Sequence, residues 1–115
     1  MVVRPSAAAV LVLLMPQRFD TFSEFYAFYL TQHATRGCRR VHVIGSAMVL
    51  VLLLYVLITA SWWLLLALPA VGYGMAWTGH AVFEKNRPAT FGHPFYSLVA
   101  DWVMFRDVLS GRIAW

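Results

Sequence analysis

The sequence predicts an all-α membrane protein: a helical hairpin of two transmembrane helices, flanked by amphipathic helices that lie at the membrane interface. Of its 115 residues, 61% are hydrophobic and only 12% are charged, against about 25% charged in typical soluble domains. No Asp, Glu, Lys or Arg occurs between Arg40 and Glu84. A soluble domain of this size exposes much of its surface and would need more charge. A membrane is therefore the expected environment.

The length allows one domain, which we place at residues 19–112, after an apolar lead-in at residues 1–18. Within the lead-in, residues 7–15 are too short to span a bilayer. They resemble the front of a signal peptide, but the sequence around Met15 lacks a small-x-small cleavage site. We expect either a partly embedded helix or an artefact of start-site choice, with Met15 as the true start. The lone Cys38 cannot form an internal disulfide, and we expect it to be structurally neutral.

A first interfacial helix is predicted over residues 21–32. Thr21 and Glu24 have the spacing of a capping box, which opens a helix. The aromatic side chains that follow, with His33, recur at three- and four-residue intervals and share one face. We expect this helix to lie along the interface with its aromatic face toward the bilayer.

The uncharged stretch predicts the hairpin. As one helix it would be roughly 65 Å long, about twice the hydrocarbon core of a bilayer. The small polar sequence Thr59-Ala60-Ser61 offers a natural break. Spans of residues 43–58 and 62–77 result, with Pro69 expected to kink the second. Gly72 and Gly74 would allow the helices to approach closely. The alternative is a buried hairpin in a soluble oligomer.

The basic residues set the expected orientation, because they flank the hairpin on both sides and its far turn has no charge. The positive-inside rule then places both flanks in the cytoplasm. The protein would be an integral, multi-pass protein of the plasma membrane in a bacterium, or of the endoplasmic reticulum in a eukaryote. After a polar loop at residues 84–90, a last helix is predicted over residues 94–109, ending at Ser110-Gly111.

The four histidines form a candidate metal site. His42 enters the first span and His80 leaves the second, so antiparallel helices bring both to one membrane face, with His33 and His93 just outside. Imidazole is the usual ligand for iron, copper or zinc. The carboxylates Glu84 and Asp101 could serve as further ligands or orient a ligand histidine. Each histidine alone could instead be structural, and a site of one ion is favoured over two.

The basic residues leave two interpretations open. They could serve only to orient the protein in the membrane and bind lipid phosphates. Alternatively one of them, such as Arg40, could bind the carboxylate of a fatty acid. Nucleic-acid binding is not expected, because the basic residues are few and topology explains them.

Several motifs resemble the Mpo1-like family: Tyr29-Leu30-x-x-His33, Arg39-Arg40-x-His42-x-x-Gly45, Gly79-His80-x-x-x-Glu84-x-Asn86-x-Pro88-Ala89, and Pro94-x-x-Ser97-x-x-x-Asp101. The resemblance implies a multi-pass membrane protein. It also implies an iron(II)-dependent dioxygenase that shortens 2-hydroxy fatty acids by one carbon, with the family's iron-binding histidines at His33, His42, His80 and His93.

On this basis the first functional hypothesis is an oxygenase. Fe(2+) would bind the 2-hydroxy acid at the cytoplasmic interface and activate O2, with Arg40 steadying the carboxylate and Glu84 or Asp101 orienting a ligand histidine. A non-enzymatic membrane scaffold or lipid-binding protein is the second hypothesis, and a zinc-dependent hydrolase the third. The chain length of the substrate and the oligomeric state are left open by the sequence.

Overall fold

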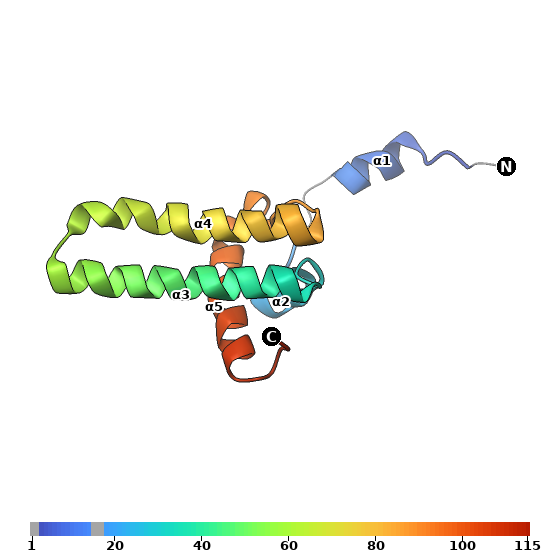
Figure 1. Ribbon diagram of the computed structural model, residues 1–115. Coiled ribbons are helices and arrows are strands. Elements are labelled where there is room, and N and C mark those ends of the chain that lie inside the picture. The colour runs from blue at the N-terminus through green and yellow to red at the C-terminus, as the bar shows by residue number, and fades with distance from the viewer. Residues whose placement is uncertain (1–2, 15–17) are drawn as a thin grey trace.

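The structure, a computed structural model, describes residues 3–14 and 18–115, and within them it is helical without strands. The all-α class is therefore confirmed. The elements are α1 (Ala7–Leu14), α2 (Phe22–Thr31), α3 (Arg36–Thr59), η1 (Trp62–Leu66), α4 (Ala67–Gly79), η2 (His80–Glu84), η3 (Ala89–Phe91) and α5 (Pro94–Leu109). Figure 1 shows α3 and α4 as antiparallel neighbours, with α5 crossing them. Met15, the suggested start, lies outside the described residues.

The hairpin turns where the sequence predicts. Ala60 adopts a left-handed conformation with φ 53° and ends α3. The returning arm begins as the 3-10 helix η1, continues as α4, and ends as the π-helix η2. Pro69 lies in the first turn of α4, where its missing N–H is tolerated. The expected kink inside a long second span is thus replaced by a change of helix type before the proline.

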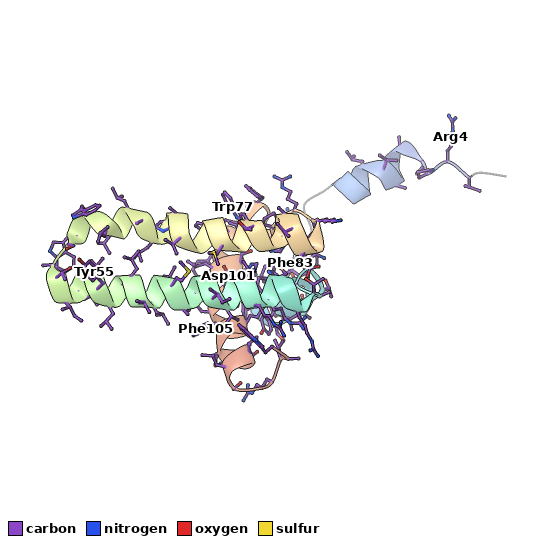
Figure 2. All side chains as sticks on the ribbon, viewed as in Figure 1. Arg4, Tyr55, Trp77, Phe83, Asp101 and Phe105 are labelled. Carbon is purple, nitrogen blue, oxygen red and sulfur yellow. The ribbon has the colours of Figure 1, made fainter. Side chains whose placement is uncertain are left out.

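Only α3 is long and apolar enough to cross a membrane, judged by length and composition over the described residues. It has 24 residues; its most apolar 18-residue stretch has a mean hydropathy of 2.6, and little of that stretch is buried. The returning arm is divided among η1, α4 and η2, and α4, its longest helix, has 13 residues, about 20 Å against a core about 30 Å thick. Two membrane spans are therefore not confirmed. Large apolar side chains are exposed on both arms, including Leu54, Trp63 and Leu66. Figure 2 shows side chains projecting outward along the hairpin.

Glycine allows the two arms to approach. A Cβ added at Gly45 would lie 2.7 Å from the Cβ of Met75, and one added at Gly72 would lie 3.4 Å from Cγ2 of Val49. At Gly74 a Cβ would meet nothing within 4 Å. The helices therefore approach most closely at Gly45; Gly72 faces α3 at an ordinary contact distance, and the predicted close approach is wrong at Gly74, which faces outward.

Helix α2 begins as predicted, with Oγ1 of Thr21 accepting a hydrogen bond from the Glu24 N–H at 3.2 Å. Its aromatic face, however, packs on protein. Phe25 and Tyr29 are fully buried in a core that includes Ala100 and Met104 of α5. Of the face predicted to lie toward the bilayer (Phe22, Tyr26, Tyr29 and His33), Tyr29 and His33 are instead buried in the protein. The prediction is wrong for these two, because α5 packs on α2.

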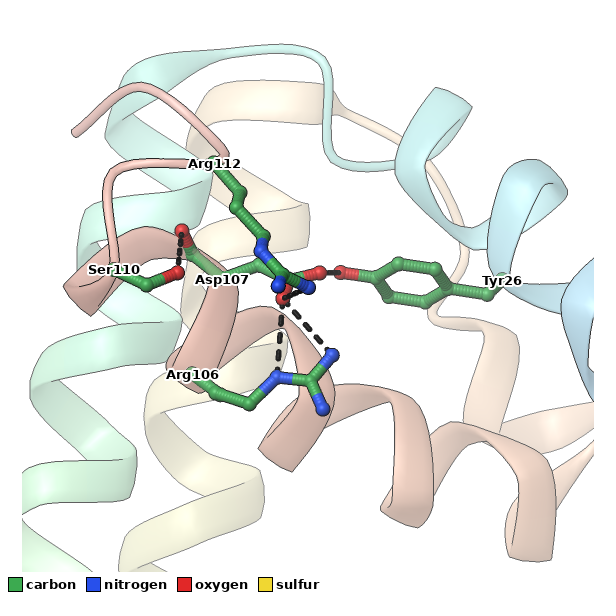
Figure 3. Close-up of polar contacts among 5 residues, drawn as sticks. All are labelled: Tyr26, Arg106, Asp107, Ser110 and Arg112. Carbon is green, nitrogen blue, oxygen red and sulfur yellow. Dashed lines mark hydrogen bonds and ion pairs between the residues drawn. The ribbon is translucent and has the colours of Figure 1, made fainter.

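Asp107 ties α2 to the end of α5 (Figure 3). The Tyr26 hydroxyl donates to Oδ2 of Asp107 at 2.8 Å, and Nε and Nη2 of Arg106 donate to Oδ1 at 3.2 and 3.1 Å. Arg112 adds an ion pair at 3.9 Å. Burial alone would raise the pKa of Asp107, but the hydrogen bonds from Tyr26 and Arg106 and the arginine charges outweigh it and lower that pKa.

Candidate metal centre

Three elements bring a cluster of buried donor atoms together at the open end of the hairpin. His33 follows α2, Cys38 and His42 lie one turn apart on α3, and His80 opens η2. One ligand atom from each residue lies within 4.8 Å of the others. A Cβ on Gly79 would lie 3.4 Å from Nδ1 of His42 and from the Cys38 carbonyl, so a glycine here gives η2 room to approach α3.

The three imidazole rings approach one another edge to face. Their centroids are 4.5 Å apart for His33–His42 and His33–His80, and 5.0 Å for His42–His80, with interplanar angles of 85°, 76° and 85°. Nε2 of His33 and Nε2 of His42 are 3.1 Å apart. Ligand nitrogens about 2.0–2.1 Å from one ion and roughly 90–110° apart would be separated by a similar distance. The geometry therefore fits a single ion.

Backbone carbonyls fix the tautomers of two of these rings. Nδ1 of His33 lies 2.7 Å from the Tyr29 carbonyl oxygen, and Nδ1 of His42 lies 2.9 Å from the Cys38 carbonyl oxygen. A carbonyl oxygen only accepts, so each Nδ1 carries the hydrogen and each Nε2 of the neutral ring has a bare lone pair.

Asn86 gives His80 the same tautomer. Its Nδ2 donates to the Gln32 carbonyl at 3.2 Å, which orients the amide so that Oδ1 faces His80. Nδ1 of His80 donates to that oxygen at 2.6 Å, leaving Nε2 bare. Lys85 makes this contact possible, because its left-handed conformation (φ 54°) turns the chain back and brings Asn86 beside His80.

The charge state of the cluster favours a metal cation over a shared proton. Burial lowers the pKa of His33 to about 2, and burial also lowers the pKa of His80 against the opposing effect of the hydrogen bond that its ring donates to Asn86. Both rings are therefore neutral at physiological pH, the form that binds metal. Bare lone pairs as close as those of His33 and His42 repel one another unless a cation lies between them.

Asp101 lies beside this cluster, as predicted. It accepts a hydrogen bond from the Tyr29 hydroxyl, and the Tyr29 ring stacks on His33 with centroids 3.9 Å apart. Burial raises the pKa of Asp101 to about 6, and the bond from Tyr29 limits the rise. Asp101 and the three histidines line a common small cavity, and among the described residues no lysine or arginine lines it.

We call this cavity the histidine chamber; it is lined by His33, His42, His80, Ser97 and Asp101, among others, and its volume is about 10 Å³. Ser97 is 2% exposed, and its Oγ is the buried side-chain polar atom without a hydrogen-bond partner among the described residues. A buried hydroxyl without a partner is costly, which indicates that something absent from the chain completes the chamber.

Glu84 has a different role from the one expected. Its Oε1 accepts hydrogen bonds from the Thr35 backbone N–H at 2.7 Å and from the Thr35 hydroxyl at 2.9 Å. It lies outside the group of donor atoms and joins the end of η2 to the start of α3. Asn86 takes the place beside His80 that the spacing suggested for Glu84.

Two further predicted residues are not brought to the cluster. The His93 ring packs against Phe19 and Phe25, with centroids 5.1 and 5.3 Å away. Arg40 is exposed, and its guanidinium lies 5.5 Å from the Trp115 ring centroid. Arg40 precedes His42 by two positions, so the two side chains leave α3 on different sides.

Sequence reasoning missed the contribution of Cys38 and Asn86. The Cys-x-x-x-His spacing of one helical turn was available, and it places Sγ of Cys38 3.7 Å from Nδ1 of His42. For Asn86 the sequence offers no local signal, because its contact depends on the chain reversal at Lys85.

A family model described as 2-hydroxy-palmitic acid dioxygenase Mpo1-like matches residues 19–113, which include all four histidines and both carboxylates predicted for the site. No curated protein and no solved structure matches the chain.

Proposed function

Because the chain belongs to the Mpo1-like family, we propose that it is an iron(II)-dependent dioxygenase that shortens 2-hydroxy fatty acids by one carbon, with O2 as co-substrate. The observation that carries the proposal is the convergence of three neutral imidazoles, each with Nδ1 engaged, in a buried chamber. Fe(2+), when bound, would supply the centre that chelates the substrate's hydroxyl and carboxylate and activates O2.

Each residue of the histidine chamber has a proposed task. His33, His42 and His80 hold the ion through Nε2, while the hydrogen bonds at Nδ1 keep the rings in place. Three protein ligands leave positions open for substrate and O2. Neutral ligands also leave the ion's charge uncompensated, which favours an anionic substrate.

The substrate head group would be held without an arginine, since Arg40 lies elsewhere. Ser97 Oγ would donate a hydrogen bond to a carboxylate oxygen, which gives this buried hydroxyl the partner that it lacks among the described residues. Asp101 accepts a hydrogen bond from the substrate's 2-hydroxyl, while Tyr29 holds the aspartate in position. The chamber, at about 10 Å³, has room for little more than the ion, so these groups would meet the head group at its mouth, beside Asp101.

We further propose that α3 crosses the bilayer and that the hairpin returns, so that the protein is multi-pass with both flanks in the cytoplasm. The support is the apolar exposed surface of the hairpin and the gathering of Arg36, Arg39, Lys85 and Arg87 at its open end. The histidine chamber would then lie near the cytoplasmic interface.

Metal analysis with an oxygen assay tests this function. The full chain purified in detergent should contain iron and consume O2 when 2-hydroxypalmitate is added, and His80→Ala should lose both. A folded wild-type protein that binds no metal would overturn the proposal and favour a non-enzymatic lipid-binding protein. Stoichiometric zinc without O2 uptake would instead indicate a hydrolase, since three histidines also form catalytic zinc sites.

A further inference from the structure

A second, larger cavity continues from the histidine chamber along the seam between α3 and α4. Its volume is about 330 Å³, and it shares His42, Ala76 and Asp101 with the chamber. A cavity of this volume lies at the lower end of the range of small-molecule sites, about 300–1,000 Å³. Figure 2 shows Asp101 at the place where α5 crosses the hairpin, between the ends marked by Tyr55 and Phe83.

The chemistry of this cavity changes along its length. The end at the histidine chamber is polar, with Asp101 and the nearby Ser97 hydroxyl. Away from it the walls are largely apolar, with Val49 from α3 and Leu68 from α4. Ala76 and Leu68 are about two helical turns apart, so the cavity extends roughly 12 Å along α4. A polar end joined to a long apolar end fits a single-chain amphiphile.

We propose that this cavity, the acyl groove, holds the alkyl chain of a 2-hydroxy acid whose head lies where the groove meets the histidine chamber, and that Gly72 sets the chain length it accepts. The inference rests on the proposed function and adds where the chain lies and what limits it. A second protein copy is a poorer occupant, because the cavity narrows into a chamber that admits only small groups.

Gly72 is the position at which the acyl groove is easily closed. It lines the groove one turn beyond Ala76, about halfway to Leu68. A Cβ there lies in ordinary contact with Val49, at 3.4 Å, so a longer side chain would extend into the groove. Gly74 lies on the same helix outside the groove, with open space around it, and provides a matched control.

Binding should therefore depend on chain length. Each methylene that the groove buries should increase affinity roughly fourfold, up to the length at which the groove is full. In Gly72→Leu the increase should stop at a shorter chain, while short 2-hydroxy acids bind as in the wild type. Gly74→Leu should behave as the wild type at every length.

Trp102 lines the acyl groove and supplies the readout. We would titrate the metal-free full chain in detergent with terminally brominated 2-hydroxy acids of 6, 8, 10, 12 and 16 carbons and follow quenching of tryptophan fluorescence. Trp102→Phe identifies the part of the signal that comes from the groove. The acids also partition into detergent, but at each chain length this lowers the apparent affinity of the variant and of the wild type equally. It therefore cancels from their ratio.

Loss of affinity in Gly72→Leu for the longer acids alone would support the proposal. Equal affinities of Gly72→Leu and the wild type at every length, or equal losses in Gly74→Leu, would overturn it. Ser46→Leu narrows the groove from the α3 wall and replaces Gly72→Leu if that variant does not fold. If the purified protein proves unable to bind iron but the metal-free titration still shows the chain-length effect, the proposed function is wrong and the acyl groove is still supported.

Discussion

Two aspartates of α5, less than two turns apart, make the same kind of hydrogen bond in different surroundings. Each accepts a hydrogen bond from a tyrosine of α2, Asp107 from Tyr26 and Asp101 from Tyr29. Asp107 also has Arg106 as a neighbour, so its pKa is lowered. Asp101 has three imidazoles and an apolar groove beside it, and its pKa is raised to about 6.

This difference in surroundings indicates that Asp107 has a structural role and that Asp101 is available to bind a ligand. Around Asp107 both carboxylate oxygens have donors, Tyr26 at Oδ2 and Arg106 at Oδ1, and two arginines lie within ion-pair distance. Around Asp101, the Ser97 hydroxyl has no hydrogen-bond partner among the described residues, and Nε2 of His33 and Nε2 of His42 face each other 3.1 Å apart with both ring hydrogens held at Nδ1. Buried polar groups without hydrogen-bond partners therefore indicate the functional site better than the presence of a carboxylate does.

The largest expected effect is on catalysis. Asp101→Asn keeps the shape of the side chain but weakens its acceptance of the substrate hydroxyl. We expect 2-hydroxypalmitate turnover to fall roughly 10²- to 10⁴-fold, with iron content retained. Asp107→Asn should leave turnover per folded molecule unchanged. Oxygen uptake normalised to bound iron measures both, and an equal loss in the two variants would erase the distinction.

The second effect is on stability, and here we expect Asp107→Asn to have the larger effect and Asp101→Asn the smaller one. Asp107→Asn removes the charge that accepts from Tyr26 and Arg106, and we expect a loss of about 1–3 kcal/mol in the free energy of unfolding. Asp101→Asn should cost much less, because it replaces a carboxylate that is poorly compensated in its buried position. Thermal unfolding of the metal-free proteins followed by circular dichroism checks the order, and greater destabilisation by Asp101→Asn would contradict it.

The third effect is the sign of the pH dependence in metal-free protein. The lowered pKa of Asp107 gives stability that is present above about pH 4 and lost as the pH falls further. The raised pKa of Asp101 gives stability that is present below about pH 4 and lost as the pH rises through about 6.

The melting temperature of Asp101→Asn relative to the wild type should therefore increase from pH 5 to pH 8. For Asp107→Asn the deficit should shrink as the pH is lowered from 5 to 3. Parallel curves for the two variants would show that their surroundings do not differ as described.

The smallest effect is expected at Arg112. Its ion pair with Asp107 is long, 3.9 Å, and its side chain is 71% exposed. Exposed pairs contribute at most about 1 kcal/mol, so Arg112→Ala should shift stability by less than about 0.5 kcal/mol and leave turnover unchanged. Chemical unfolding curves that overlay the wild type would agree with this, whereas a shift as large as that of Asp107→Asn would not.

The sequence predicts those parts of the fold that local chemistry determines. The last helix has the predicted bounds, Pro94–Leu109, because a proline opens it and Ser110-Gly111 closes it. The turn after Thr59 is confirmed for the same kind of reason. The second arm differs, because Pro69 and the π-helix η2 divide it into three helix types that hydropathy alone does not distinguish.

The site is predictable to the extent that antiparallel helices bring their ends together. This argument places His42 and His80 as neighbours, and the structure agrees. It fails for His93, whose ring packs against aromatic side chains of the α2 region. Partners from distant segments, such as Asn86 with Gln32, depend on tertiary packing that no local pattern encodes.

The central claim is that Nε2 atoms of three particular histidines converge on one ion. The ratio of bound iron(II) to protein, measured in the full chain and in single alanine variants of all four histidines, tests it most directly. We predict a single ion per chain in the wild type and in His93→Ala, and its loss in His33→Ala, His42→Ala and His80→Ala. Iron that persists without His33 but disappears without His93 would contradict the account.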